Sequence, residues 1–197
     1  VDLKQGALTE PLAVAVHACR NMHPGKHDRA LIVGAGPIGL LIAYLLKKQY
    51  QLPFVAVADI DPWRLSLAIR AGVDQTAPDA GALAGDCTLI VDAAGSEAAF
   101  SAILEQARHG STIYISAIYE KIPRLDLNWV VGKELSIKGN NDYNMESLEE
   151  AARLIESGNY DFSWLISRIL PAKEAGKAFQ FLTARDKRDL KILLDFS

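Results

Sequence analysis

The stretch from Ala30 to Asp59 reads ALIVGAGPIGLLIAYLLKKQYQLPFVAVAD and decides the fold. Its first apolar run, ALIV, is typical of a buried strand and ends in a turn with three glycines. The apolar residues Ile38, Leu41 and Leu45 follow at helical spacing, and a second apolar run, FVAVA, ends at the carboxylate of Asp59. The stretch therefore predicts a strand, a helix and a second strand joined by a glycine-rich turn.

The three glycines have the spacing of a dinucleotide-binding motif. Gly34 permits the tight turn, Gly36 lets the backbone approach a pyrophosphate, and Gly39 allows the helix to pack closely on the strand. The first helical turn, with Pro37 and Ile38, offers unpaired N–H groups and a positive dipole end to phosphates. We take these five residues as candidates for cofactor binding.

Asp59 bears on the identity of the cofactor, because it follows Gly39 by twenty residues. A carboxylate there can accept hydrogen bonds from the adenosine ribose, and it would repel a 2′-phosphate. NAD is therefore favoured over NADP. Arg64 could receive a 2′-phosphate, but with Asp59 retained we expect it along the adenine or ribose.

Composition excludes several classes of partner. The 197 residues are half hydrophobic and carry a formal net charge of −3, which gives no basic footprint for nucleic acid or an anionic membrane. No apolar run approaches the roughly 20 residues that span a bilayer, and no signal peptide is visible. We expect a cytoplasmic protein in which Cys19 and Cys87 are buried hydrophobes.

The rest of the chain to position 141 predicts four more strands, near 75–77, 88–92, 112–116 and 135–139, alternating with helices or loops. Six such strands make the two halves of a Rossmann fold, an α/β doubly wound parallel sheet. After the strand that ends at Asp92, the small residues Ala93, Ala94 and Gly95 are a plausible wall against the cofactor. The same segment also fits an ordinary turn in which Ser96 caps the next helix.

The two ends of the chain predict a second body. A helix over 6–21, with Thr9 as its N-cap, is apolar nearly all round and must be buried. Residues 142–197 add a helix from Asn144 to Glu156, a strand, a helix near 173–184 and a final strand. We divide the chain into a cofactor-binding domain, 12–141, and segments of another domain, 1–11 and 142–197. The inward helix residues are predicted to be Leu65, Ala68 and Ile69; Leu148, Ala152 and Ile155; and Ala175, Ala178, Phe179 and Leu182.

With these motifs in order, the chain resembles the medium-chain, zinc-dependent alcohol dehydrogenase superfamily, in its polyol, sugar-acid and threonine dehydrogenase branch. The resemblance rests on GALTEPL at 6–12 with His17, the glycine motif, Asp59 with Arg64, DAAG at 92–95, and the tail from 154 to 194. It implies a two-domain enzyme whose GroES-like catalytic domain carries the zinc. The ligands of that domain have no counterpart in these 197 residues, so we expect remnants of it at both ends of the chain.

The resemblance also implies roles for single residues. Zinc would polarise the hydroxyl of a small alcohol, and the alkoxide would pass a hydride to NAD. Glu10 aligns with a zinc ligand or with a carboxylate near the zinc-bound water, although by itself it is a first-turn helix acid. Val14 and Ile38 would pack on the nicotinamide and Ser116 would lie close to it. Backbone groups near 115 and 140 would meet its carboxamide.

Two other functions remain open. A zinc-free quinone reductase of the same superfamily usually prefers NADPH and lacks an acid at the position of Asp59. A non-catalytic protein that binds or senses NAD would keep the fold without the chemistry. The resemblance further implies a homo-oligomer, with the edge of the sixth strand as a candidate contact.

Overall fold

A computed structural model describes residues 3–184 and 188–197 of the chain. Its strands are β1 (Arg29–Val33), β2 (Phe54–Ala58), β3 (Gln75–Ala77), β4 (Leu89–Asp92), β5 (Thr112–Ile115), β6 (Ser136–Gly139), β7 (Ile166–Pro171) and β8 (Lys191–Asp195). Its α-helices are α1 (Leu3–Gly6), α2 (Thr9–Met22), α3 (Pro37–Lys48), α4 (Pro62–Arg70), α5 (Gly81–Ala84), α6 (Glu97–Gln106), α7 (Asn128–Gly132), α8 (Met145–Glu156) and α9 (Ala175–Thr183). Two short 3₁₀ helices cover Ser163–Leu165 and Ala172–Glu174.

The larger sheet has six parallel strands in the order β3-β2-β1-β4-β5-β6, which is the doubly wound order predicted from the sequence. The chain moves outward from β1 in one direction through β3, then returns to β4 on the other side of β1. Ile32 of β1 is paired with Val57 of β2 and with Val91 of β4, so this central strand has neighbours on both edges. The strand order therefore reverses between β1 and β4, where the two halves of the sheet meet.

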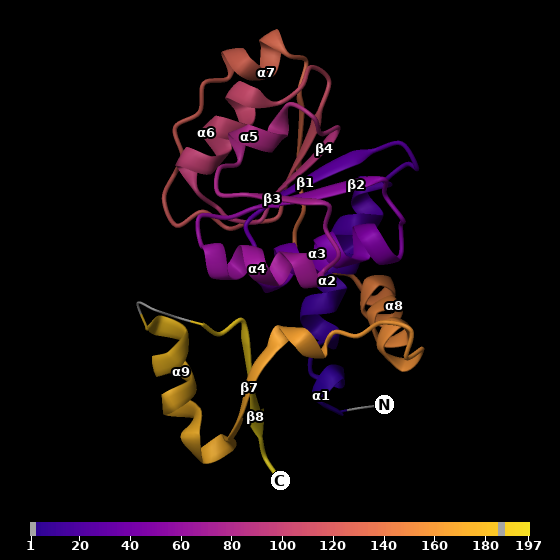
Figure 1. The fold of residues 1–197 in the computed structure, drawn as a ribbon, viewed down its shortest axis with the longest axis vertical. Coiled ribbons are helices and arrows are strands. Elements are labelled where there is room, and N and C mark those ends of the chain that lie inside the picture. The colour runs from indigo at the N-terminus through magenta and orange to yellow at the C-terminus, as the bar shows by residue number, and fades with distance from the viewer. Residues whose placement is uncertain (1–2, 185–187) are drawn as a thin grey trace.

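Helices cover both faces of this sheet (Figure 1). Alternate residues of β1 pack on opposite faces of the sheet. Ile32 belongs to the core that includes α2 and α3, and Leu31 belongs to the core that includes α5 and α6. Cys19 and Cys87 are buried, one in each core, and neither forms a disulfide. The prediction that both are buried hydrophobes is confirmed. Among the described residues, no helix is long and apolar enough to cross a membrane.

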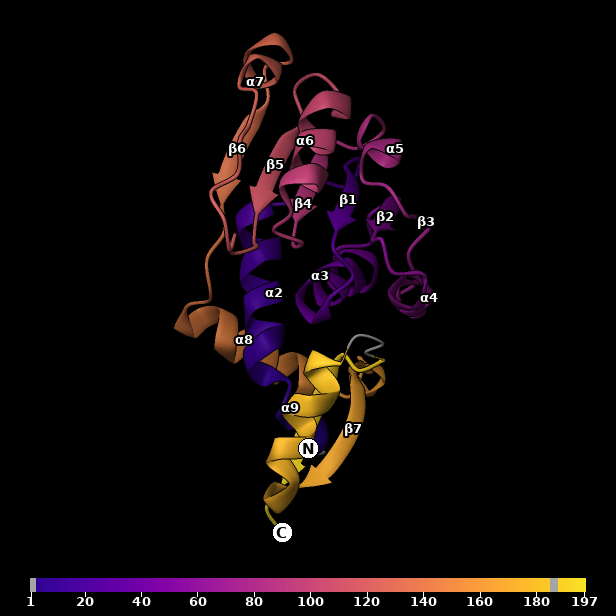
Figure 2. The ribbon, with the colours of Figure 1, turned by 90° about the vertical axis from the view of Figure 1, so that its left-hand side faces the viewer.

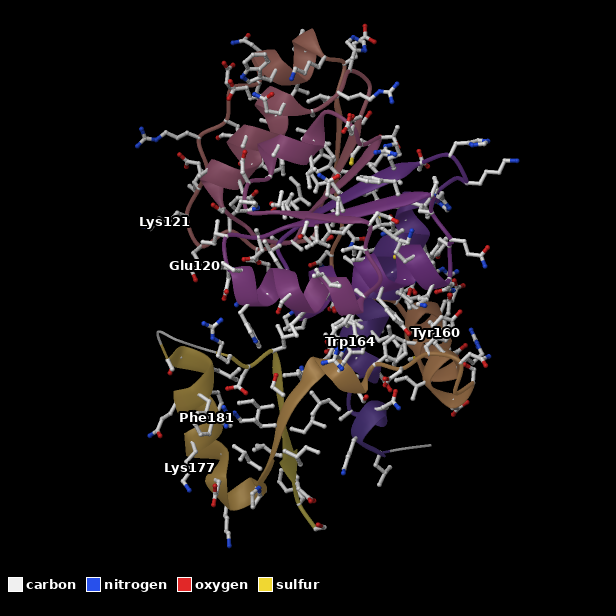
Figure 3. All side chains as sticks on the ribbon, in the orientation of Figure 1. Glu120, Lys121, Tyr160, Trp164, Lys177 and Phe181 are labelled. Atoms are coloured by element: carbon white, nitrogen blue, oxygen red, sulfur yellow. The ribbon has the colours of Figure 1, made fainter. Side chains whose placement is uncertain are left out.

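A smaller body made of residues 160–184 and 188–197 lies beyond the carboxyl ends of the larger sheet (Figure 2). Its strands β7 and β8 form a separate parallel pair, and α9 packs beside them. An aromatic cluster joins this body to α3: the ring of Tyr44 lies 5.5 Å from that of Phe162, 6.0 Å from that of Trp164 and 6.4 Å from that of Tyr160. Figure 3 shows Tyr160 and Trp164 at this junction.

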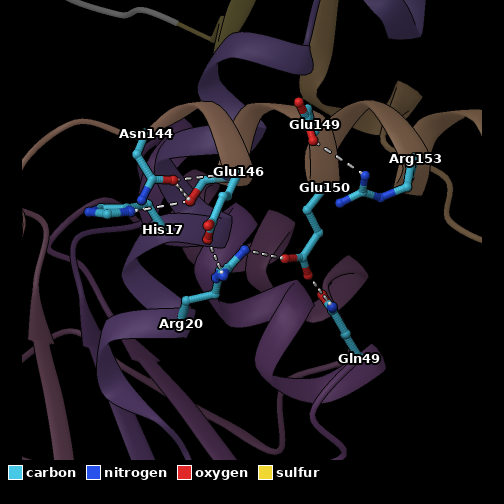
Figure 4. Close-up of polar contacts among 9 residues, drawn as sticks. His17, Arg20, Gln49, Asn144, Glu146, Glu149, Glu150 and Arg153 are labelled. Carbon is cyan, nitrogen blue, oxygen red and sulfur yellow. Dashed lines mark hydrogen bonds and ion pairs between the residues drawn. The ribbon is translucent and has the colours of Figure 1, made fainter.

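Helix α8 docks on α2 through polar side chains (Figure 4). Arg20 of α2 donates to Glu146 at 2.7 Å and to Glu150 at 3.3 Å, and the His17 ring nitrogen Nδ1 lies 3.2 Å from the Ser147 hydroxyl. The residues that α8 buries are Ser147, Ala151 and Ile155. Of the inward residues predicted there, Ile155 is buried, Leu148 is partly buried and packs against the same core, and Ala152 is partly buried. Ser147 and Ala151 are buried as well, so the packed stripe is wider than predicted.

Three further details differ from the sequence predictions. Helix α2 has Leu8 as its N-cap, because the preceding turn is itself helical, and the Thr9 hydroxyl donates to the Gly6 carbonyl instead. Ile69 is 66% exposed, because α4 buries Ala68 and packs Leu65 against the core. Phe179 is 68% exposed, because it lies on a different side of α9 from the buried Ala178.

Candidate functional site

A cavity of about 410 Å³ opens at the carboxyl ends of the strands, where the sheet order reverses. This volume is within the usual range for a small-molecule site, roughly 300–1,000 Å³. Ligands of doubly wound sheets bind at this place, outside the strand ends. The cavity is lined by Val33, Gly34, Gly36, Ala58, Asp59, Ile60, Arg64, Pro78, Asp79, Ala80, Ala93, Ala94, Ser96, Ala98 and Ala99.

Each of the three glycines meets a different steric environment. Gly34 has φ +103°, and a Cβ there would lie 2.8 Å from the Ala93 carbonyl carbon. A Cβ on Gly39 would lie 2.0 Å from the Gly34 carbonyl oxygen, because α3 packs directly on the turn. Around Gly36 no described heavy atom would come within 4 Å of a Cβ. The open side of the turn is therefore at Gly36, which faces the cavity.

The amino end of α3 lies at the same place. Gly36 is its N-cap, Pro37 begins it, and among the described side chains none caps this end. The first-turn N–H groups therefore remain for a ligand or solvent, and the helix dipole adds partial positive charge. This end of the cavity can bind an anionic group such as a phosphate.

The Asp59 side chain connects the glycine turn after β1 to the loop after β2 through two hydrogen bonds. Its side chain is 8% exposed, its Oδ2 accepts from the Ala35 N–H at 2.7 Å, and its Oδ1 accepts from the Asp61 N–H at 2.9 Å. The guanidinium of Arg64 lies 3.8 Å from Asp59 Oδ2 and 4.0 Å from Asp61 Oδ2. The carboxylate thus braces the glycine turn and holds an arginine on the cavity wall.

A second carboxylate, Asp92, organises the loop after β4. It is fully buried; its Oδ1 accepts from the N–H groups of Ala94 at 3.0 Å and Gly95 at 3.2 Å, and its Oδ2 accepts from the Tyr119 hydroxyl. Burial and this hydrogen bond to a carboxylate raise the pKa of Tyr119 well above its ordinary value. Gly95 has φ +65°, and a Cβ on it would meet the Ile118 carbonyl oxygen at 2.9 Å. The small residues predicted here as a wall are held as one rigid turn.

The predicted site residues divide into two sets. Gly34, Gly36, Asp59, Arg64, Ala93 and Ala94 line the cavity. Within the described part of the chain, Pro37, Ile38, Gly39, Gly95, Ser116 and Glu10 lie off its lining.

Sequence reasoning missed several lining residues, among them Ile60, Pro78, Asp79 and Ala80. Ile60 follows β2, and the other three follow β3. These residues could have been predicted from their positions, because residues that follow neighbouring parallel strands meet at one edge of the sheet.

Ser116 lies directly after β5, at the same edge of the parallel sheet as the cavity. Its backbone N–H donates to the Asp92 carbonyl at 2.9 Å, and its hydroxyl accepts from the Asn140 side-chain amide at 3.3 Å. The Asn140 backbone N–H donates to the Ile115 carbonyl at 2.8 Å. The exits of β5 and β6 are therefore joined by both backbone and side chains.

Comparisons with known proteins agree with this geometry, although no family model matches the sequence. The 2-dehydro-3-deoxy-L-galactonate 5-dehydrogenase of Pseudoalteromonas atlantica is 32% identical over 188 residues, covering 91% of this chain and 54% of that protein. A sorbitol dehydrogenase of Arabidopsis thaliana is 28% identical over 211 residues, covering 99% of this chain and 57% of that protein. The chain belongs to the zinc-dependent medium-chain alcohol dehydrogenase family. The resemblance predicted from the sequence motifs is thereby confirmed.

Solved structures agree with membership of this family. The L-idonate 5-dehydrogenase of Escherichia coli K-12 superposes with a TM-score of 0.91 at 25% identity, over 100% of this chain and 58% of that one. An Escherichia coli CFT073 protein named a short chain alcohol dehydrogenase, in complex with NADH, superposes with a TM-score of 0.87 at 26% identity, over 96% of this chain and 58% of that one. The chain thus spans a little over half the length of the dehydrogenases that it matches.

The zinc in the family's name has no complete site among these residues. Glu10 is exposed in the first turn of α2, while His17 is paired with Ser147. Over residues 3–184 and 188–197, no three His, Cys, Asp or Glu side chains gather as metal ligands. The described residues therefore fit a dinucleotide at the glycine turn, and they do not by themselves fit a zinc ion.

Proposed function

We propose that this chain is the NAD(H)-binding part of a zinc-dependent dehydrogenase that oxidises a secondary alcohol of a polyol, sugar acid or similar small substrate. The observation that carries the proposal is the open space at Gly36, between the tightly packed Gly34 and Gly39. In that space the backbone can approach a pyrophosphate, and the amino end of α3 supplies N–H groups. Bound NAD would accept the hydride from the substrate carbon.

We propose NAD rather than NADP as the cofactor. The Asp59 carboxylate lies on the cavity wall at the end of β2, where the adenosine ribose is expected to bind. Arg64 is already drawn toward two carboxylates, Asp59 and Asp61, which reduces its positive potential for a 2′-phosphate. Ala93 and Ala94 would form the facing wall, and Gly95 would keep that loop in its turn.

The division into domains is also proposed. Residues 12–141 would bind the cofactor, and residues 1–11 and 142–197 would belong to the catalytic domain. In this arrangement Glu10 would lie near a zinc ion whose other ligands come from outside these 197 residues. The chain alone would then bind NAD without full activity. The intact enzyme would act in the cytoplasm as a homo-oligomer, with the exposed edge strand β6 as a contact.

A second candidate is a non-catalytic protein that binds or senses NAD. It is favoured by one observation, that the described residues bring no three metal ligands together. An NADPH-dependent quinone reductase is less favoured, because Asp59 is present at the end of β2.

The test uses the complete reading frame that encodes this chain. The intact product, supplied with zinc, should oxidise sorbitol, xylitol or a hexonate with NAD, and removal of zinc by a chelator should abolish the reaction. Glu10→Ala should lower kcat while leaving NADH affinity unchanged, because Glu10 lies off the cofactor cavity. NADH binding without any zinc-dependent oxidation would support the non-catalytic protein instead.

A further inference from the structure

The carboxyl ends of β5 and β6 lie at the same edge of the parallel sheet as the cavity. In a doubly wound sheet the second nucleotide of a dinucleotide binds beyond the carboxyl ends of the second set of strands, here β4, β5 and β6. If NAD binds as proposed above, its nicotinamide lies on this side. The side chains that follow β5 and β6 can then contact the nicotinamide.

Three polar side chains form a hydrogen-bonded chain at this place. Asn21, at the end of α2, donates from its Nδ2 to the Asn140 Oδ1 at 2.8 Å. Asn140, directly after β6, donates from its own Nδ2 to the Ser116 hydroxyl oxygen at 3.3 Å. Asn140 is 8% exposed, so its amide has few other partners available. The three residues come from three elements that are far apart in the sequence.

In the structure the hydrogen bonds that link these three side chains run in one direction. The Asn140 oxygen faces the Asn21 amide, so the Asn140 NH₂ group must face Ser116. A lone pair of the Ser116 oxygen is thereby occupied. Within residues 3–184 and 188–197 Ser116 donates no hydrogen bond of its own. Its hydroxyl hydrogen is therefore available to an acceptor in the crevice.

We propose that Asn140, oriented by Asn21, is a positioning residue that sets the Ser116 hydroxyl as a hydrogen-bond donor to the carboxamide oxygen of the nicotinamide. This rests on the proposed function. Asn21 does not touch the ligand. Its amide fixes the orientation of the Asn140 amide, and that orientation decides whether the Ser116 hydroxyl donates or accepts a hydrogen bond. These three hydrogen-bonded side chains would thus favour a cofactor with a carbonyl oxygen at its nicotinamide end.

A purely structural role, in which the amides only fasten α2 to β6, predicts a different response to mutation. Asn21→Asp removes the donor and presents a carboxylate to Asn140. The Asn140 amide then turns its NH₂ toward residue 21, and its oxygen accepts the Ser116 hydroxyl hydrogen. Ser116 would now present lone pairs to the crevice and repel a carbonyl oxygen. If the amides only fasten α2 to β6, this variant should keep that role, because its hydrogen bonds are reversed and not lost.

Isothermal titration calorimetry of the purified chain with NADH and with ADP-ribose tests the proposal, because ADP-ribose lacks the nicotinamide. Ser116→Ala and Asn21→Asp should each weaken NADH binding about 3- to 10-fold, the range of one hydrogen bond, and leave ADP-ribose binding unchanged. The matched control Asn159→Asp adds the same charge at an exposed position outside the crevice and should bind both ligands as the parent does. Thermal melting checks that each variant is folded.

Two results would overturn the inference alone. They are unchanged NADH binding in both variants, and equal weakening of NADH and ADP-ribose, which would mean that the amides only support the fold. If the parent chain binds neither ligand, the proposed function itself is wrong and the inference falls with it.

Discussion

Two glycines three residues apart should respond in opposite ways to the same substitution. A Cβ on Gly39 would lie 2.0 Å from the Gly34 carbonyl oxygen, whereas real Cβ contacts are longer than 3.0 Å. Helix α3 would have to move away from the turn by about 1 Å. A Cβ on Gly36 would meet no described atom within 4 Å, and its φ of −77° suits alanine.

The magnitudes follow from these distances. Overpacking of this kind costs about 3 kcal/mol, which lowers Tm by about 6–12 °C in a chain of this size, so Gly39→Ala should destabilise the fold clearly. Gly36→Ala should change stability by less than about 0.5 kcal/mol. Its methyl group would stand between the α3 N–H groups and a pyrophosphate. Loss of one charge-assisted hydrogen bond there weakens NADH binding by about 10- to 100-fold.

Thermal melting and isothermal titration calorimetry with NADH separate the two effects. The expected pattern is a folded, weakly binding Gly36→Ala and a destabilised Gly39→Ala. Equal losses of Tm in the two variants, or parental NADH affinity in Gly36→Ala, would refute the steric reasoning.

Three further outcomes are expected. Asp59→Ala should lower the preference for NADH over NADPH on the order of 10-fold in titrations, because it removes a repelling charge and releases Arg64 from one partner. Phe162→Ala should reduce the free energy of unfolding by about 3–5 kcal/mol in urea, because the buried ring packs on Tyr44; a loss below about 1 kcal/mol would contradict this. Burial raises the pKa of Cys87 from 9.0 to about 12, so the stability gained from its neutral thiol is complete below pH 9 and is lost as the pH rises toward 12. Cys87→Ala should flatten the alkaline unfolding profile over that interval.

The large sheet was predictable because its signals are local. Apolar runs bounded by turns define the strands, and the glycine spacing defines the turn between β1 and α3. The separate roles of Gly34, Gly36 and Gly39 were expected from the motif and agree with the space around each residue. Asp59 was expected at the cavity and lies there, but its hydrogen bond to the Ala35 N–H depends on two loops meeting.

Contacts between distant elements were not predictable in this way. The burial of the polar Ser147 on α8 depends on His17 of another helix, and apolar periodicity did not predict it. Phe179 was expected inward because apolar residues usually are, but α9 turns the neighbouring Ala178 inward and leaves Phe179 exposed. The Asn21 and Asn140 amides are 119 positions apart in the sequence, and lone asparagines carry no periodic signal.

The central claim is that the crevice beside Gly36 and Asp59 binds NAD in preference to NADP. Isothermal titration calorimetry of the purified 197-residue chain with NADH and NADPH measures this directly. The account predicts saturable binding of NADH to one site per chain and NADPH binding at least about 10-fold weaker, because the Asp59 carboxylate opposes the 2′-phosphate. Equal or tighter binding of NADPH, or no binding of NADH, would contradict it.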